Sequence, residues 1–163
     1  ALVGESAGGN LGLALMHRAK RSATPFPKAI ALLSPWCDLT NSGYSLVDND
    51  GRDPVLTKQH LDFAAKCYGK ENNLADTDIS PMNGKFDSTF PPCYISTGTR
   101  DLLMSQSICL ANKLREHDVK VDLRVWEDLW HVFEWDNNLP EAKASIRAIS
   151  EFLTNHMNKT CGG

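Results

Sequence analysis

The 163-residue chain has 42% hydrophobic residues and a formal net charge of −3, values typical of a soluble globular protein. Its Lys and Arg residues are scattered, so no basic surface is expected to bind nucleic acid or an anionic membrane. No apolar run reaches the ~18–20 residues that a transmembrane helix needs. We therefore expect neither a nucleic-acid partner nor a membrane span, and the oligomeric state stays open.

The first third of the chain predicts a strand, a tight turn, a helix and a second strand. Residues 1–3 (ALV) are typical of the end of a buried strand, and residues 4–8 (GESAG) form a glycine-rich turn. A helix is expected over about 10–21, with Leu11, Ala14 and Leu15 on its apolar side. Residues 28–34 (KAIALLS) are continuously apolar and predict a strand buried on both faces.

The segment from 41 to 84, called the excursion below, is rich in Asp, Asn, Gly and Pro and is expected to leave the sheet. It contains one predicted helix, with Thr57 as its N-cap and Gly69 as its C-terminal stop.

Regular alternation returns after the excursion. Strands are predicted over 91–98 and 119–127, and helices over 105–117 and 140–157. Strands that alternate with helices indicate an α/β fold with a mostly parallel sheet.

The five cysteines are Cys37, Cys67, Cys93, Cys109 and Cys161. An odd number at wide, irregular spacing is typical of neither a disulfide framework nor a zinc site. We expect mostly buried thiols, which favours a reducing compartment such as the cytoplasm.

The turn at 4–8 fits the pattern G-x-S-x-G, a strand-to-helix turn that exposes a serine hydroxyl above a sheet. Ser6 is the candidate nucleophile. Gly4 and Gly8 are expected because side chains there would collide with the neighbouring strand or helix. The alternative is a glycine-rich turn with an incidental serine.

A serine nucleophile needs a base, and the base needs an acid that orients it. Asp101 follows the strand at 91–98, and His131 follows the strand at 119–127, so both are expected at the carboxyl edge of the sheet. Asp101 could instead serve only as a carboxylate at a helix N-terminus. His131 could be a structural residue packed between Trp130 and Phe133.

Other candidates are less favourable by position. The remaining histidines, His17, His60, His117 and His156, fall on predicted helices and are expected at the surface or at helix ends. Of the other carboxylates, Asp122 lies within a strand, Asp128 lies in the same loop as His131, and Asp87 precedes its strand.

Four segments, GESAGGN, SPWCDLT, STGTRDLL and WEDLWHVF, together resemble the hormone-sensitive-lipase-like family of α/β-hydrolases. The resemblance covers about residues 3–153. It implies Ser6 as nucleophile, Asp101 as acid, His131 as general base, and the Ala7 N–H as part of the oxyanion hole. It also implies that the excursion is a cap-type insertion in a single catalytic domain that spans 1–163.

The chain departs from the family pattern at three places. Glu5 stands where many members have Asp, and Arg100-Asp101-Leu102 lacks the common Asp-Pro pair. The family places a His-Gly-Gly-Gly-type oxyanion loop upstream of the nucleophile, and nothing but Ala1, Leu2 and Val3 precedes the turn here. We therefore expect the carboxyl-terminal half of the fold, which could be inactive alone.

The expected activity is hydrolysis of short or medium acyl esters through a Ser-Asp-His triad, without metal or organic cofactor. Trp36, Tyr44, Leu46 and Phe63 are candidates for lining the substrate pocket. The alternatives are an amidase or peptidase, and a non-catalytic protein that binds a small molecule on the same fold.

Overall fold

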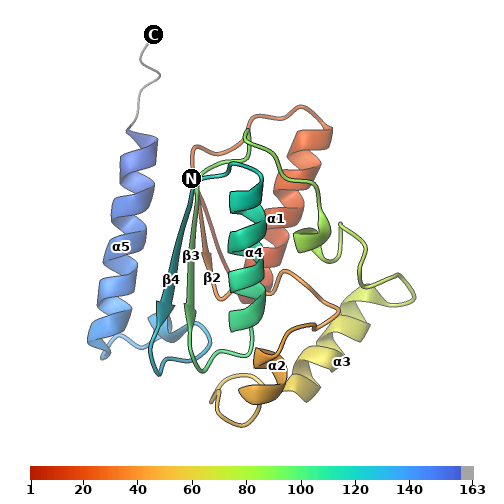
Figure 1. Ribbon diagram of the computed structural model, residues 1–163, viewed down its shortest axis with the longest axis vertical. Coiled ribbons are helices and arrows are strands. Elements are labelled where there is room, and N and C mark those ends of the chain that lie inside the picture. The colour runs from red at the N-terminus through yellow and green to blue at the C-terminus, as the bar shows by residue number, and fades with distance from the viewer. Residues whose placement is uncertain (159–163) are drawn as a thin grey trace.

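The computed structural model describes residues 1–158, which form a parallel sheet of four strands with helices on both faces (Figure 1). The sheet order is β1-β2-β3-β4. The strands are β1 (Leu2–Glu5), β2 (Ile30–Leu33), β3 (Cys93–Gly98) and β4 (Val121–Trp126). The predicted α/β class with a parallel sheet is therefore confirmed, and the strands are shorter than expected at several ends.

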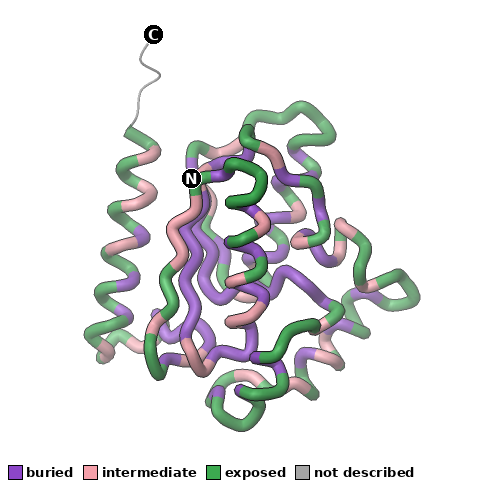
Figure 2. Tube along the Cα trace, in the orientation of Figure 1, coloured by how far each residue is buried: buried purple, intermediate pink, exposed green. Residues whose placement is uncertain are grey.

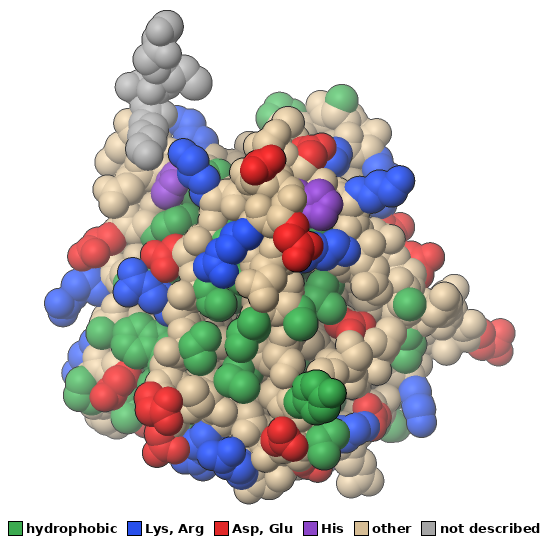
Figure 3. All heavy atoms as spheres, in the orientation of Figure 1, with side chains coloured by type: hydrophobic (Ala, Val, Ile, Leu, Met, Phe, Trp, Pro, Cys, Tyr) green, Lys and Arg blue, Asp and Glu red, His purple; other side chains and the backbone are tan. Residues whose placement is uncertain are grey.

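Three long helices cover the sheet. Helices α1 (Ser6–Arg21) and α4 (Met104–Glu116) lie on one face, and α5 (Pro140–Met157) lies on the other. None of the helices within the described residues has the length and hydropathy that crossing a membrane requires. On the face shown in Figure 3, acidic and basic side chains are interspersed.

The excursion carries α2 (Ser45–Asp48), α3 (Lys58–Gly69) and the short 3-10 helix η1 (Pro81–Asn83), all outside the sheet. A second 3-10 helix, η2 (Phe133–Trp135), follows β4. Helix α3 begins as predicted, because the Thr57 side chain accepts a hydrogen bond from the His60 N–H at 3.3 Å.

Strands β2 and β3 are buried along their whole length, as the tube in Figure 2 shows for the centre of the sheet. On the face of α1 and α4, a core of Leu13, Met16, Leu32, Ile95 and Leu110 fills the space between helices and sheet. Full burial of one such side chain contributes about 1.5–3 kcal/mol. Packing of this core fixes where the ends of the strands lie.

The predicted apolar side of α1 was wrong. Leu11 and Leu15 are 58% and 52% exposed, whereas Leu13 and Met16 are buried. The helix also begins at Ser6, earlier than expected, and it turns Gly9 and Gly12 toward the strands. Glycine carries no hydrophobic signal, so the pattern of large apolar residues indicated the opposite side.

Close approach favours glycine at both positions. A Cβ at Gly9 would lie 2.9 Å from Pro35 Cβ, and one at Gly12 would lie 2.8 Å from Leu2 Cδ2. Non-bonded carbon atoms essentially never lie this close, so the rigid Pro35 ring excludes a side chain at Gly9, whereas at Gly12 the flexible end of Leu2 would have to move.

His17 is also buried, contrary to the expectation of a surface position. Its Nε2 donates to the Pro81 carbonyl oxygen at 2.9 Å, and its ring packs on Phe86 at 4.9 Å between centroids. Burial lowers the pKa of His17, so the neutral ring is favoured there. His17 thus fastens the end of the excursion to α1.

Two of the four described cysteines, Cys37 and Cys93, are buried, and burial raises the pKa of both thiols. Cys67 and Cys109 are exposed, so only two of the four described cysteines match the expectation of buried thiols. Cys161 lies outside the described residues.

We predict that Gly9→Ala destabilises the protein by about 1–3 kcal/mol, because the rigid Pro35 ring cannot yield to the new methyl group. The neighbouring Gly8→Ala is the matched control. A Cβ at Gly8 meets nothing within 4 Å, and alanine is the better helix former by about 1 kcal/mol. Thermal unfolding of both variants tests this, and equal melting temperatures would contradict it.

Candidate active site

The carboxyl ends of the strands meet at one edge of the sheet, and a polar residue follows each of them. The register pairs Glu5 with Leu33 and Gly98 with Trp126, so the ends are nearly level. Ser6 follows β1 and Ser34 follows β2; the loops after β3 and β4 carry Asp101 and His131. This edge is where ligands bind in open parallel sheets.

Ser6 occupies the strained position expected of a nucleophile turn. Its φ is +47°, a left-handed conformation that costs a non-glycine residue about 1–3 kcal/mol. A Cβ at Gly4 would lie 2.5 Å from the Gly8 carbonyl oxygen, so Gly4 is required. The expected clash at Gly8 was wrong, since the space around it is open. The Trp36 N–H anchors the turn by donating to the Ser6 carbonyl oxygen at 3.0 Å.

Asp101 and His131 form a buried pair, with Asp101 Oδ1 3.1 Å from His131 Nδ1. The same Oδ1 accepts the Leu103 N–H at 2.9 Å, and Oδ2 accepts the Thr97 hydroxyl at 2.8 Å. Burial alone would raise the pKa of Asp101, but the hydrogen bond and charge of His131, together with the hydrogen bonds of Ser34 and Leu103, outweigh it and lower the pKa. The carboxylate is therefore ionised and directed at the imidazole.

The loop that carries His131 lies against the loop that carries Asp101. A Cβ at Gly98 would lie 2.0 Å from the Leu129 carbonyl oxygen, so only glycine permits this approach. The Arg100 N–H donates to the same Leu129 oxygen at 2.9 Å. Beyond His131, the Val132 N–H donates to the Ser34 hydroxyl at 3.1 Å, with Val132 at φ +49°.

Sequence reasoning missed Ser34, Thr97 and Gly98 as parts of this site. Gly98 and Ser34 stand at strand ends, a position that could have indicated them. Thr97 lies inside β3 and carries no comparable signal.

Ser6 and His131 line the same hollow of about 490 Å³, together with Glu5, Val55, Trp130, Val132, Trp135 and Asp136. The Trp135 indole donates to Glu5 Oε2 at 2.7 Å across it. Among the described residues, no hydrogen bond joins the Ser6 hydroxyl to the His131 ring. Such catalytic contacts commonly tighten only when substrate is bound.

A second hollow of about 250 Å³ opens beside Ala7. Its walls are mostly apolar: Ala7, Asn10, Leu11, Trp36, Leu39, Ala64 and Tyr68. Ala7 is the second residue of α1, so its N–H belongs to the first helical turn, where N–H groups have no partner within the helix.

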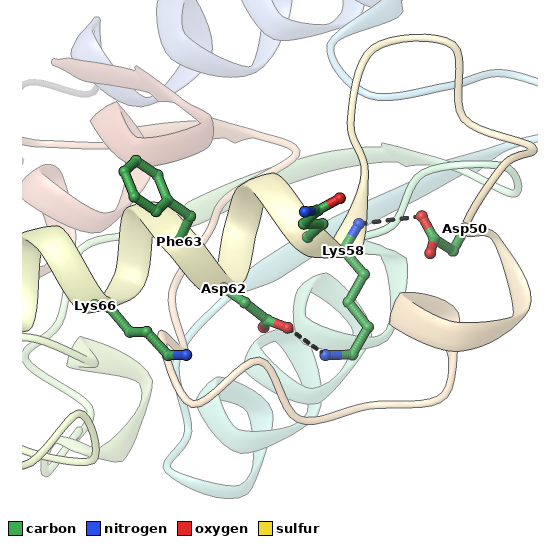
Figure 4. Close-up of a pocket in the computed structure, with 6 residues that line it drawn as sticks. Asp50, Lys58, Asp62, Phe63 and Lys66 are labelled. Atoms are coloured by element: carbon green, nitrogen blue, oxygen red, sulfur yellow. Dashed lines mark hydrogen bonds and ion pairs between the residues drawn. The ribbon is translucent and has the colours of Figure 1, made fainter.

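The four residues expected in a substrate pocket do not line one common hollow. Trp36 lines the second hollow. Leu46 is fully buried in a cluster with Trp36 and Leu102, and Tyr44 is 85% exposed. Phe63 is 70% exposed and borders a separate hollow with Asp50, Lys58, Gln59, Asp62 and Lys66. Figure 4 shows two hydrogen bonds among these residues, from the Lys58 backbone N–H to Asp50 and from the Lys58 ammonium to Asp62.

Glu134, in η2 just after His131, is a buried carboxyl that sequence reasoning also missed. Its Oε1 accepts the hydroxyls of Ser96 at 2.6 Å and Ser145 at 2.8 Å, while Oε2 has no partner among the described residues. Burial raises the pKa of Glu134, and the charge of Asp101 raises it further. Glu134 therefore keeps its proton to higher pH than an exposed glutamate does.

A raised carboxyl pKa stabilises the folded protein at low pH and destabilises it as pH rises from the unfolded to the folded pKa. We predict that Glu134→Gln, which cannot ionise, gains in melting temperature relative to the parent as pH rises from 4 to 8. Differential scanning calorimetry at several pH values measures the difference in melting temperature between variant and parent, with exposed Glu151→Gln as control. A difference that does not change with pH would contradict the prediction.

The comparisons with known proteins agree with this architecture. A family model for the alpha/beta hydrolase fold matches residues 1–135. An esterase of Acinetobacter venetianus is 33% identical over 93% of this chain and 50% of its own length. An acetyl-hydrolase of Streptomyces hygroscopicus is 30% identical over 93% of this chain and 51% of its own.

Solved structures extend the match. A hormone-sensitive lipase from a metagenome library superposes with a TM-score of 0.91 at 30% identity, covering 95% of this chain and 54% of its own. An esterase of the bacterial hormone-sensitive lipase family gives a TM-score of 0.91 at 30% identity, and the match covers 96% of this chain and 52% of the esterase. The chain thus spans about half the length of the relatives that it matches, and it belongs to the hormone-sensitive-lipase-like family of α/β-hydrolases.

Proposed function

We propose that the protein carrying this chain is a serine carboxylester hydrolase. The observation that carries the proposal is the buried Asp101–His131 pair, whose imidazole borders the same hollow as the strained Ser6. Relatives named as an esterase and an acetyl-hydrolase support the same chemistry.

In this mechanism His131 Nδ1 donates to Asp101, which leaves Nε2 unprotonated and able to accept the Ser6 proton. The serine oxygen attacks the ester carbonyl carbon, and the carbonyl oxygen becomes an oxyanion. His131 then gives the proton to the leaving alcohol, which leaves an acyl-enzyme. His131 then takes a proton from water, whose oxygen attacks the acyl carbonyl carbon; the carboxylic acid leaves, and His131 returns the proton to the Ser6 oxygen.

The Ala7 N–H is the proposed oxyanion donor within this chain, because it lies directly after Ser6 at the start of α1. By the family resemblance, further donors come from a loop upstream of the nucleophile. Removal of one such donor typically slows turnover about 10²–10³-fold.

The apolar hollow beside Ala7 is the proposed site of the acyl chain. Its volume of about 250 Å³ is small, which favours short or medium acyl groups over the long chains of triglycerides. Ala64 and Tyr68 of the excursion form part of its wall, in keeping with a cap-type role for residues 41–84.

The first test of this proposal is Ser6→Ala. We expect turnover of a short p-nitrophenyl ester to fall at least ~10³-fold, since the nucleophile is lost, and labelling by a fluorophosphonate to disappear. Exposed Ser88→Ala is the matched control and keeps parental activity. Parental turnover by Ser6→Ala would refute the proposal, and faster turnover of an anilide than of its ester would favour an amidase.

The acyl assignment predicts a change of chain-length preference in Ala64→Phe. The larger side chain narrows the hollow, so the ratio of kcat/KM for butyrate to that for acetate esters should fall. Ala75→Phe, at an exposed position of the excursion, is the matched control. An unchanged ratio in Ala64→Phe would place the acyl chain elsewhere.

A further inference from the structure

We infer that Asn49 and Asp53 of the excursion are positioning residues for the triad acid. They hold the backbone of the loop 99–103, which carries Asp101, although neither side chain contacts the imidazole. This inference rests on the proposed function.

Asn49 is buried between α2 and the acid loop. Its side-chain amide donates to two carbonyl oxygens at once, that of Thr99 at 3.0 Å and that of Asp101 itself at 2.9 Å. The Arg52 guanidinium donates to Asn49 Oδ1 at 3.3 Å, which keeps the two N–H groups of Asn49 turned toward the loop. One side chain therefore fixes the backbone on both sides of Arg100.

Asp53 holds the next peptide group. Its Oδ2 accepts the Leu102 N–H at 3.2 Å, while Oδ1 accepts the Val55 N–H at 2.9 Å within its own turn. Ser45 adds a third contact by donating to the Leu102 carbonyl oxygen at 2.7 Å and accepting the Ser105 N–H at 2.9 Å.

These contacts satisfy backbone groups that regular structure does not. Residues 99–103 connect β3 to α4, and among the described residues the Thr99 carbonyl and the Leu102 N–H and carbonyl have no backbone partner, whereas the Asp101 carbonyl also accepts the Met104 N–H at 3.2 Å. An unpaired backbone group in the interior is costly, because it has lost its hydrogen bonds to water. The excursion supplies side-chain partners for these groups from about 50 residues earlier in the chain.

The opposite side of the acid loop bonds to the loop of His131. The Arg100 N–H donates to the Leu129 carbonyl oxygen at 2.9 Å, and the Thr99 hydroxyl accepts the Asp128 N–H at 2.8 Å. The distance between Asp101 and His131 therefore depends on contacts from both sides. Loss of the excursion's contacts leaves the acid free to move away from the imidazole.

The test is Asn49→Asp in the protein that carries this chain. The change preserves size, removes both N–H donors and sets a carboxylate against two carbonyl oxygens. A misplacement of about 1 Å costs roughly 10²-fold in rate, so we expect kcat to fall by about that factor with KM nearly unchanged.

Active-site counting separates positioning from simple loss of folded protein. A displaced Asp101 orients the imidazole less well for proton transfer, so the loss should fall on kcat and leave KM nearly unchanged. Rates are normalised to active sites counted by fluorophosphonate labelling. Asn72→Asp is the matched control: it also removes a side-chain bond to a carbonyl oxygen, that of Gly69, but far from the acid loop.

Two outcomes would overturn the inference: parental kcat per labelled site in Asn49→Asp, or a loss of kcat/KM that comes from a raised KM alone. Ser6→Ala distinguishes its failure from that of the proposed function. If turnover by the parent does not depend on Ser6, the proposed function fails. If turnover depends on Ser6 and either overturning outcome appears, only the positioning role fails.

Discussion

The hydrogen bond between Asp101 and His131 is the interaction on which this edge of the molecule depends. A carboxylate that is fully buried is very costly unless charge and hydrogen bonds compensate it, and here both oxygens are satisfied. The compensation comes from three different segments: β3, the start of α4 and the loop after β4. The parallel sheet brings these segments together, because all its strands end at the same edge.

Part of the backbone strain of the described residues lies at the same place. Ser6, Ser34 and Val132 all have positive φ values, and each lies directly at or beside a group that the proposed mechanism or its scaffold uses. Each such residue costs about 1–3 kcal/mol, so it persists only where the surrounding contacts determine its conformation. The Trp36 N–H on the Ser6 carbonyl and the Val132 N–H on the Ser34 hydroxyl are contacts of this kind.

Sequence alone was sufficient for features that depend on pattern. Alternating strands and helices predicted the parallel sheet, and their order placed Ser6, Asp101 and His131 at strand ends. It failed where small or polar residues decide the packing. The apolar residues of α1 indicated the wrong side because Gly9 and Gly12 face the strands. Asn49 could not be found, because bonds between a side chain and a distant backbone leave no periodic signal.

The excursion also has a consequence for how such an enzyme can change. One segment provides Ala64 and Tyr68 to the wall of the proposed acyl site and Asn49 and Asp53 to the acid loop. If the proposed function holds, selectivity and turnover are therefore not independent properties of separate modules. An exchange of residues 41–84 with a relative, made to acquire a new substrate range, would also replace the contacts that hold the loop of Asp101, the proposed triad acid. Chimaeras that retain Asn49 and Asp53 and vary only α3 would change substrate selectivity without changing the contacts to the loop of Asp101.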